Sequence, residues 1–322
     1  MSKVVVVGSY NQDFAWTTDV LPAPGATRLG TFAGGPGGKG FNQAVAAARA
    51  GAPTTFITAL GADDTAAGAR ALATAEGIDL RDEVHPGLAT GTAGIFVDAS
   101  GRNVIVVAPG ANAALGAGFV QAQAEAFGGA RVVLAQLEVN ADAVQAALDA
   151  AGQAGALAIL NPAPANAPTT DTMLAVADVL TPNETEFAAM LSRHEGREVD
   201  AATLATMPDA GLHALCRQLA PRATVVVTLG DAGAFVSHGE HLRGDHAAHY
   251  RLPAQPVTAV DTTGAGDAFS GALAAALARA APGQPFADAL RFACAFAALS
   301  TERPGAALAM PRREDVAARF GG

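Results

Sequence analysis

The sequence predicts an α/β protein built as a three-layer sandwich: helices flank a mostly parallel central sheet, and a small β-sheet forms a lid. Short Val, Leu and Ile runs alternate with Ala-rich stretches of helical periodicity, and one β-rich segment interrupts this alternation. Half of the 322 residues are hydrophobic but only 5% are aromatic, which suits helices packed closely on a sheet. No clean boundary divides the chain, so we expect residues 1–322 to form one domain.

Five apolar runs are predicted to be strands that are buried on both faces. They span residues 3–9, 131–137, 156–162, 177–183 and 223–230. The stretches 140–155 and 183–191 have helical periodicity, so strands and helices alternate as in a parallel sheet. Ligands of such sheets bind at the carboxyl ends of the strands. Polar residues or Gly stand at these ends, namely Glu138, Asn161, Asn183 and Gly230.

The lid is predicted from two segments that do not follow the alternation. Residues 91–112 form two β-rich runs around Ser100 and Gly101, which is typical of a hairpin. Residues 14–34 contain two Pro and several Thr and favour an extended conformation. We expect a lid formed by approximately residues 14–36 and 90–109.

Charge and composition exclude several classes of function. A net charge of -10 argues against a nucleic-acid partner. No apolar run approaches the roughly 18 to 20 residues of a membrane span, and the N-terminus lacks a signal-peptide core, so we expect a cytoplasmic protein. Cys216 and Cys294 are predicted to be small buried hydrophobic residues. The His residues between 238 and 249 lack metal-binding spacing and favour a solvated loop.

The first glycine-rich segment, residues 34–44, satisfies G-x-G-x-x-G, but no buried strand precedes it, so a dinucleotide site as in a dehydrogenase is weakly supported. A Walker A loop is excluded, because Ala33 stands where Gly is required and Gly40 follows Lys39. The segment instead places Lys39 and Asn42 at the start of a helix, where they could donate to hydroxyls or phosphates. A helix start with a solvent-facing Lys is the alternative.

Three further turns follow predicted strands. Asn11 and Asp13 suit two neighbouring hydroxyls, although Asn and Asp are equally typical of a plain turn. Asn183 and Glu186 either cap a helix or organise the water shell of Mg²⁺. The glycine turn of residues 228–233 could approach a nucleotide or simply connect a strand to a helix.

The segment VDTTGAGDAFSGAL, residues 260–273, combines a glycine turn with a carboxylate. Backbone N–H groups of Gly264 and Gly266 at a helix start favour an anion. Asp267 would repel a phosphate in the ground state, but it could accept a proton from a hydroxyl that attacks a phosphoryl group held by those amides. The alternative is a carboxylate that only interacts with the helix dipole.

Together these motifs resemble the ribokinase-like, or PfkB-type, carbohydrate kinases over nearly the whole chain. The motifs GSYNQD, GGKGFNQAVAAARAGA, GANAAL, LNPAPA, TPNETE, TLGDAG and VDTTGAGDAFSGAL follow the order and approximate spacing of that family. The GGKG-x-NQ segment is most similar to ribokinases. The resemblance implies a three-layer fold with a β lid that often forms a dimer contact.

The resemblance also implies roles for individual residues. Asp267 is the expected catalytic base, and the amides of Gly264, Ala265 and Gly266 form the anion hole. The sugar-binding residues are Asn11, Asp13, Gly38, Lys39, Asn42 and Glu138, together with Asp267. The ATP site includes Asn183, Glu186, Thr228, Gly230, Gly266 and Cys294, with Glu186 reaching Mg²⁺ through water. An activating K⁺ ion is expected beside Asp261 and the carbonyl groups of Thr263, Ser300, Arg303 and Gly305.

The expected activity is therefore ATP-dependent phosphorylation of a sugar's primary hydroxyl, with D-ribose as the first choice and a homodimer formed through the lid. Another sugar such as a ketohexose, a nucleoside, or a non-catalytic sugar-binding role are the alternatives. Phe41 departs from the family pattern, which has Ala there, and either reshapes the sugar pocket or packs beneath the lid. Cys294 stands where the family often has Asn or His near the adenine.

Overall fold

A nine-stranded sheet runs through the middle of the molecule in the computed structural model, which describes residues 3–321. Its order is β13-β12-β11-β10-β9-β8-β1-β4-β5, and all neighbours are parallel except the pairs β11–β12 and β12–β13. The strands are β1 (Lys3–Val7), β4 (Thr54–Gly61), β5 (Asp79–His85), β8 (Ala130–Ala135), β9 (Leu157–Leu160), β10 (Val179–Leu180), β11 (Thr224–Thr228), β12 (Ala234–Ser237) and β13 (His249–Leu252). The predicted mostly parallel sheet is confirmed.

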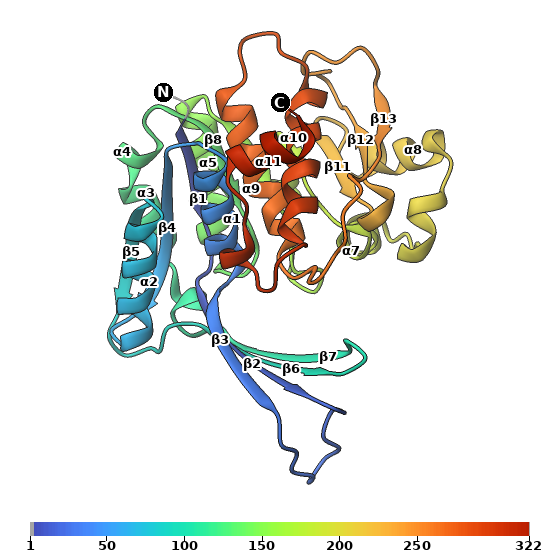
Figure 1. The fold of residues 1–322 in the computed structure, drawn as a ribbon. Helices are drawn as coiled ribbons and strands as arrows, with labels where there is room; N and C mark the ends of the chain where they lie inside the picture. Colours follow the sequence, from blue (N-terminus) through green and yellow to red (C-terminus); the bar gives the residue numbers. More distant parts are fainter. Residues whose placement is uncertain (1–2, 322) are drawn as a thin grey trace.

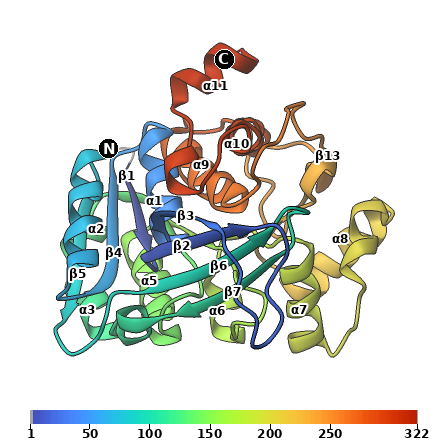
Figure 2. The ribbon, with the colours of Figure 1, turned by 60° about the horizontal axis from the view of Figure 1, so that its bottom comes forward.

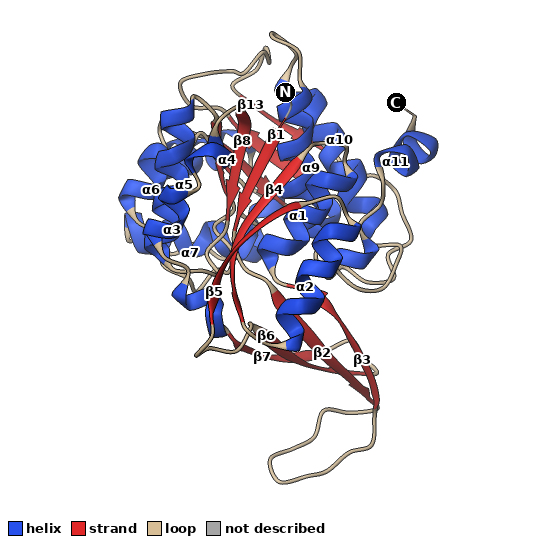
Figure 3. Cartoon of the chain, turned by 90° about the vertical axis from the view of Figure 1, so that its left-hand side faces the viewer, coloured by secondary structure: helices blue, strands red, loops and turns tan. Residues whose placement is uncertain are grey.

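Helices cover both faces of this sheet, as Figure 3 shows from the side. Successive residues of β1 explain the arrangement: Val4 and Val6 join the core beneath α1, α9 and α10, whereas Val5 and Val7 join the core beneath α5 and α7. The helices are α1 (Lys39–Arg49), α2 (Asp64–Ala75), α3 (Ala117–Ala122), α4 (Ala124–Phe127), α5 (Ala141–Ala154), α6 (Asp171–Val176), α7 (Glu184–Glu195), α8 (Asp209–Leu219), α9 (Ala265–Arg279), α10 (Phe286–Ser300) and α11 (Arg313–Phe320). The three-layer prediction is therefore confirmed.

A separate four-stranded sheet projects from the body (Figure 1) and lies across one end of it when viewed from that end (Figure 2). Its order is β3-β2-β6-β7, with β2 and β6 parallel and the outer pairs antiparallel. The strands are β2 (Asn11–Thr18), β3 (Thr31–Gly37), β6 (Thr92–Asp98) and β7 (Asn103–Ala108). The hairpin predicted around Ser100 and Gly101 joins β6 to β7. We call this sheet the lid.

The five predicted strands and two predicted helices all form, most of them shorter than predicted. The prediction for the His-containing stretch was right only in part. His241 and His246 lie exposed in a loop, but His238 is buried, and His249 begins β13, which pairs with β12 at the sheet edge. An edge strand buries only part of its side chains, so the polar residues there mask the strand pattern.

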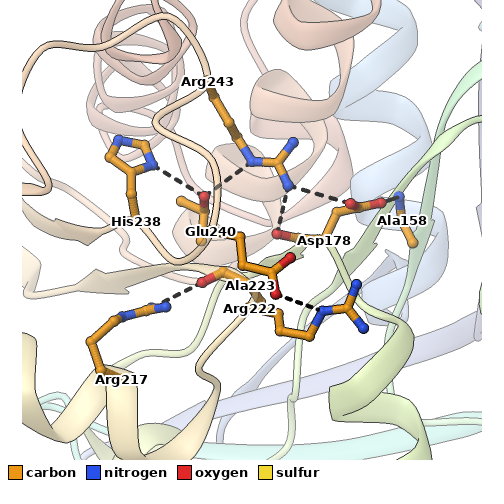
Figure 4. A network of polar contacts seen from close by, with 9 residues as sticks. Ala158, Asp178, Arg217, Arg222, Ala223, His238, Glu240 and Arg243 are labelled. Carbon is orange, nitrogen blue, oxygen red and sulfur yellow. Dashed lines mark hydrogen bonds and ion pairs between the residues drawn. The ribbon is translucent and has the colours of Figure 1, made fainter.

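A polar network joins the amino ends of central parallel strands, at the opposite end of the strands from their carboxyl ends (Figure 4). Arg243 donates through Nε to Thr224 Oγ1 at 3.0 Å and through Nη2 to the Asp178 carbonyl oxygen at 3.0 Å. Asp178 Oδ2 in turn accepts from the Ala158 N–H at 2.9 Å, and Thr224 Oγ1 lies 3.1 Å from His238 Nδ1. These bonds join the starts of β9, β10 and β11. The polar groups at this end of the strands are therefore paired with one another rather than left open to a ligand.

Close packing at Gly positions brings α1 and α9 together. A Cβ added at Gly271 of α9 would lie 2.4 Å from the Gln43 carbonyl oxygen of α1. A Cβ added at Gly40 would lie 2.5 Å from the Gly8 carbonyl carbon at the end of β1. Only Gly permits these approaches, which set the starts of both helices beside the carboxyl end of β1.

Within residues 3–321, no helix combines the length and apolar character required to cross a membrane.

Candidate active site

A cavity of about 150 Å³ lies at the carboxyl ends of the central strands. Its walls come from the starts of α1, α7 and α9 and from the ends of β9, β10 and β11. The residues that line it are Lys39, Asn161, Ala163, Thr181, Asn183, Glu186, Thr228, Thr262, Gly264, Ala265, Gly266 and Asp267. The cavity thus lies at the sheet edge that the strand pattern predicted.

The glycine turn before α9 presents free backbone donors to this cavity. Gly264 is left-handed, with φ 76°, and precedes the first helical residue, Ala265. The Ala265 N–H donates to the Thr262 carbonyl oxygen at 3.2 Å, but no acceptor among residues 3–321 receives a backbone bond from the N–H of Gly264 or Gly266. The latter two amides are therefore free to bind an anion, whereas the Ala265 amide is already engaged.

Asp267 lies one residue beyond these amides and is only 6% exposed. Its Oδ2 accepts from Asn42 Nδ2 and its Oδ1 from Gln43 Nε2, both at 2.9 Å. Burial raises the pKa of Asp267, while the positive charge of Lys39 and the two amide donors oppose that rise. The result is an oriented carboxylate whose proton affinity is above that of an ordinary Asp, which suits a general base.

The lid contributes the next two predicted residues. Asn11 and Asp13 lie on β2 rather than in a turn, so the plain-turn alternative is wrong. Burial, followed by the charges of Glu138 and Asp267, raises the pKa of Asp13 to about 6. Gly38, with φ 86°, allows the chain to pass close to this strand, since a Cβ there would lie 2.6 Å from the Asn11 nitrogen. These contacts set the lid strand against the start of α1.

Lys39 and Glu138 complete this side of the site. Glu138 Oε2 accepts from Ser9 Oγ at 2.6 Å and from the Lys39 N–H at 3.0 Å. Burial alone would lower the pKa of Lys39, but the negative charges of Asp267, Glu138 and Glu186 outweigh it and raise the pKa. Lys39 is therefore a cation that faces carboxylates, and the solvent-facing alternative is wrong.

Asn42 retains unused hydrogen-bonding capacity. Its Oδ1 is buried and has no partner among residues 3–321, although its Nδ2 donates to Asp267. A buried acceptor without a partner costs free energy, and a ligand hydroxyl donating to it would remove that cost. Asn42 Oδ1 is therefore an acceptor that a ligand hydroxyl beside Asp267 could use.

Phe41 does not reach this site. It is 2% exposed, its ring lies 5.1 Å from that of Tyr10 and 6.0 Å from that of Phe56, and it lines none of the described cavities. The ring packs in the core against Tyr10 and Phe56, neither in the wall of a described cavity nor beneath the lid as the two alternatives had it. The departure from Ala at this position therefore lies in the core.

A second cavity, of about 520 Å³, adjoins the first and shares Thr228, Thr262, Ala265 and Gly266 with it. Gly230 and Cys294 also line it. Burial raises the pKa of the Cys294 thiol to about 11, so the side chain acts as a small neutral group. The larger cavity has the size and mostly apolar lining of a nucleotide-base pocket, and it opens toward the free amides.

Asn183 and Glu186 form a capping box at the start of α7. The Glu186 N–H donates to Asn183 Oδ1 at 2.8 Å, and the Asn183 N–H donates to Glu186 Oε2 at 2.9 Å. Both residues also line the smaller cavity, and burial raises the pKa of Glu186. The capping interpretation is correct, and it leaves Glu186 Oε1 available to water or a ligand.

Two of the residues predicted for a monovalent cation, Thr263 and Gly305, are bonded to the Asp261 carboxylate. Asp261 Oδ1 accepts from the Thr263 N–H and its Oδ2 from the Gly305 N–H, both at 2.9 Å. Burial opposes ionisation of Asp261, but these bonds lower its pKa and keep it charged. Ser300 ends α10 and Arg303 follows it. The Asp261 carboxylate and the predicted carbonyl groups are an oxygen-only donor set, which fits K⁺, and the cation site stays a prediction.

Three residues of the site were not singled out from the sequence. Asn112 donates to Asn11 Oδ1 at 2.9 Å, and Gln43 donates to Asp267 and to Asn161 Oδ1. Gln136 donates to Gln43 Oε1 at 2.6 Å. Gln43 and Asn112 stand inside recognised motifs, so their motif membership was the available signal. Gln136 precedes Glu138 by two residues and carried no signal of its own.

Comparison with known proteins identifies the family. The model of the pfkB family of carbohydrate kinases matches residues 1–313. The chain belongs to this family. The kinase is 36% identical to the ribokinase of Schizosaccharomyces pombe over 329 aligned residues, which cover 99% of this chain and 98% of that protein.

Solved structures of ribokinases have the same fold. The ribokinase of Giardia lamblia superposes with a TM-score of 0.84 at 29% identity, covering 98% of this kinase and 97% of that chain. The Arabidopsis thaliana ribokinase, solved with ribose and ATP, superposes with a TM-score of 0.79 at 30% identity, covering 97% and 96%. This chain is therefore a carbohydrate kinase, a phosphotransferase with an alcohol acceptor.

Proposed function

We propose that this kinase transfers the γ-phosphoryl group of ATP to the primary hydroxyl of D-ribose, giving ribose 5-phosphate and ADP. The relatives named above carry the choice of sugar and of nucleotide. One observation carries the chemistry: the Asp267 carboxylate stands beside the free amides of Gly264 and Gly266, where two cavities meet. A proton acceptor and an anion site are thus neighbours, as in-line phosphoryl transfer requires.

Phosphoryl transfer forms one bond to the γ-phosphorus and breaks another. The hydroxyl oxygen of the sugar forms a bond to the γ-phosphorus while its proton passes to Asp267. The bond between the γ-phosphorus and the β,γ-bridging oxygen breaks, and ADP leaves with that electron pair. The amides of Gly264 and Gly266 donate to the transferred phosphoryl oxygens, and Lys39 adds positive charge on the same side.

Asn11, Asp13, Lys39, Asn42 and Glu138 are proposed to bind the sugar hydroxyls. Asn42 Oδ1 supports this assignment, because it is a buried acceptor without a protein partner. Gly38 shapes the turn. Asn112 donates to Asn11 Oδ1, which restrains the orientation of the Asn11 amide.

The nucleotide is proposed to occupy the larger cavity, with Thr228 and Gly230 near its phosphates and Cys294 near the base. Mg²⁺, when bound, neutralises phosphate charge, and Glu186 would hold it through water. K⁺, when bound beside Asp261, adds positive charge near the glycine turn, and carbonyl groups of Thr263, Ser300, Arg303 and Gly305 would complete its ligands. Within residues 3–321 no group of three or more His, Cys, Asp and Glu side chains is arranged to hold a metal.

We also propose that residues 1–322 act as one kinase domain and that two copies associate through the lid in the cytoplasm, where ATP is available. Both lid faces are apolar. Trp16 lies against Phe32 and Phe96 on one face, which Val104 and Val106 of β7 share, and Ile105 and Val107 of β7 are exposed on the other face. Patches of this kind mark protein interfaces. Sedimentation should give twice the chain mass, and Val106→Lys should yield monomers.

The test of function is an ADP-release assay with Mg²⁺ and K⁺ over pentoses, ketohexoses and nucleosides. Ribose should give the highest kcat/KM. A ketohexose or nucleoside that exceeds ribose would reassign the substrate within the same fold. If no acceptor stimulates ADP release although ribose binds, the protein is a sugar-binding protein.

A further inference from the structure

A chain of buried amide side chains lies behind Asp267. Gln43 of α1 is fully buried and uses its amide group completely. Its Nε2 donates to Asp267 Oδ1 at 2.9 Å and to Asn161 Oδ1 at 3.0 Å, and its Oε1 accepts from Gln136 Nε2 at 2.6 Å. Asn161 Nδ2 in turn donates to the Thr181 carbonyl oxygen at 2.8 Å. The two amide hydrogens and the carbonyl oxygen of Gln43 are all paired.

We propose that Gln43, whose carbonyl oxygen is paired with Gln136, is a positioning residue that presents the Asp267 carboxylate to the acceptor hydroxyl. The inference rests on the proposed kinase function of Asp267. A carboxylate rotates freely about its last side-chain bond unless both oxygens are held. Asn42 holds Oδ2 and Gln43 holds Oδ1, so both donors are required to fix the carboxylate plane.

The acceptors Asp267 Oδ1 and Asn161 Oδ1 determine which end of the Gln43 amide faces Asp267, and Gln136 Nε2 pairs with the oxygen at its other end. If the Gln43 amide were reversed, its oxygen would face both of those acceptors. Such pairs of like groups in a buried site are unfavourable. Gly8 makes room for this arrangement, since a Cβ at that position would lie 1.9 Å from Gln136 Oε1. That oxygen is buried without a partner in the described chain, so the presence of Gln at position 136 costs free energy.

Loss of the Gln43 donor changes the pKa of Asp267 in one direction. Burial raises the pKa of Asp267, and Lys39 and the donors Asn42 and Gln43 lower it. The carboxylates that also act on this group are Glu138, Asp13 and Glu186. Loss of the Gln43 donor therefore raises the pKa further, so a larger fraction of Asp267 is protonated at a given pH. The acid limb of the pH profile of kcat should move to higher pH.

Three variants test the proposal in the full chain. Gln43→Met and Gln136→Met keep the side-chain length but remove the donors, and Gln145→Met is the control on the outer helix α5, where Gln145 pairs with Asp149. Gln43→Met should lower kcat by about 10- to 100-fold and shift the acid limb upward, since small misplacements at a reacting centre have effects of this size. Gln136→Met should shift the limb in the same direction by less. Gln145→Met should match the wild type, and thermal unfolding should show that all three fold.

A second measurement does not depend on turnover. The ¹³C resonance of the Asp267 carboxyl carbon, assigned from its absence in Asp267→Asn, reports the titration of that group in the ligand-free protein. Its midpoint should rise in Gln43→Met. A folded Gln43→Met with unchanged midpoint, kcat and acid limb would overturn the positioning role. If the wild type fails to phosphorylate ribose, the proposed function falls, and the titration still decides the role of Gln43.

Discussion

Replacing Asp267 by Asn tests the assignment of the catalytic base most directly. The change preserves the shape of the side chain but removes the atom that accepts the sugar's proton. We expect kcat to fall by about 10²- to 10⁴-fold. At 1.36 kcal/mol for each factor of ten, this corresponds to about 3–5 kcal/mol of lost transition-state stabilisation.

The structure allows this loss to be separated from a helix-dipole effect. Asp267 is in the first turn of α9, where a carboxylate contributes about 0.3–1 kcal/mol to stability. Asp142 occupies the first turn of α5, is exposed and lies outside both cavities. Asp142→Asn therefore shares the dipole effect of Asp267→Asn but not the loss of the base, and its kcat should equal that of the wild type.

The assay is ADP release at saturating ATP and ribose, with calorimetric titration of ribose and ADP as the binding control. Asp267→Asn should still bind both ligands, because the amides of the glycine turn and the remaining sugar-binding residues are unchanged. Turnover within about tenfold of the wild type would refute the general-base reasoning, since only a smaller, dipole-sized effect would then remain.

Three further predictions concern the surrounding groups. Because the pKa of Asp13 is raised to about 6, protonation below that pH removes an acceptor, so the KM for ribose should rise as pH falls through about 6; a KM that stays constant there would contradict this. Gly264→Ala should cost about 1–3 kcal/mol and lower both the unfolding temperature and kcat, because φ is 76° and the new Cβ would lie 3.0 Å from Ala306 Cβ; an unchanged melting curve would argue against strain. The wild type should be more active in K⁺ than in Na⁺, and Asp261→Ala should remove that difference; equal wild-type rates in the two salts would exclude the cation site.

The central sheet could be predicted because its strands are apolar on both faces. In β1 consecutive Val residues enter opposite cores, which leaves no other placement for such a run. Strands β12 and β13 could not be predicted in the same way. They form an antiparallel edge of the sheet. The buried His238 pairs with Asp245, seven residues later in the chain, and no local sequence pattern encodes that contact.

The place of a candidate site residue was predictable where its own side chain suggested a chemistry, as with Asp267 and Lys39, which both line the smaller cavity. It was not predictable where a role depends on a partner from a distant segment. Gln43 and Gln136 are 93 positions apart, and only the packing of α1 against the end of β8 brings their amides together. Phe41 illustrates the converse, since its neighbours in the sequence line the site while its ring points into the core.

The continuity of β2 has a mechanical consequence. The strand that carries Asn11 and Asp13 at its start carries Trp16 three residues after Asp13, in the sheet that stands off the body. A strand is a continuous extended element, so the start of β2 beside the site and its continuation in the lid move together. A rotation of the lid part of β2 would displace Asn11 and Asp13 as well. Under their proposed role in sugar binding, movement of the lid and binding of the sugar are coupled.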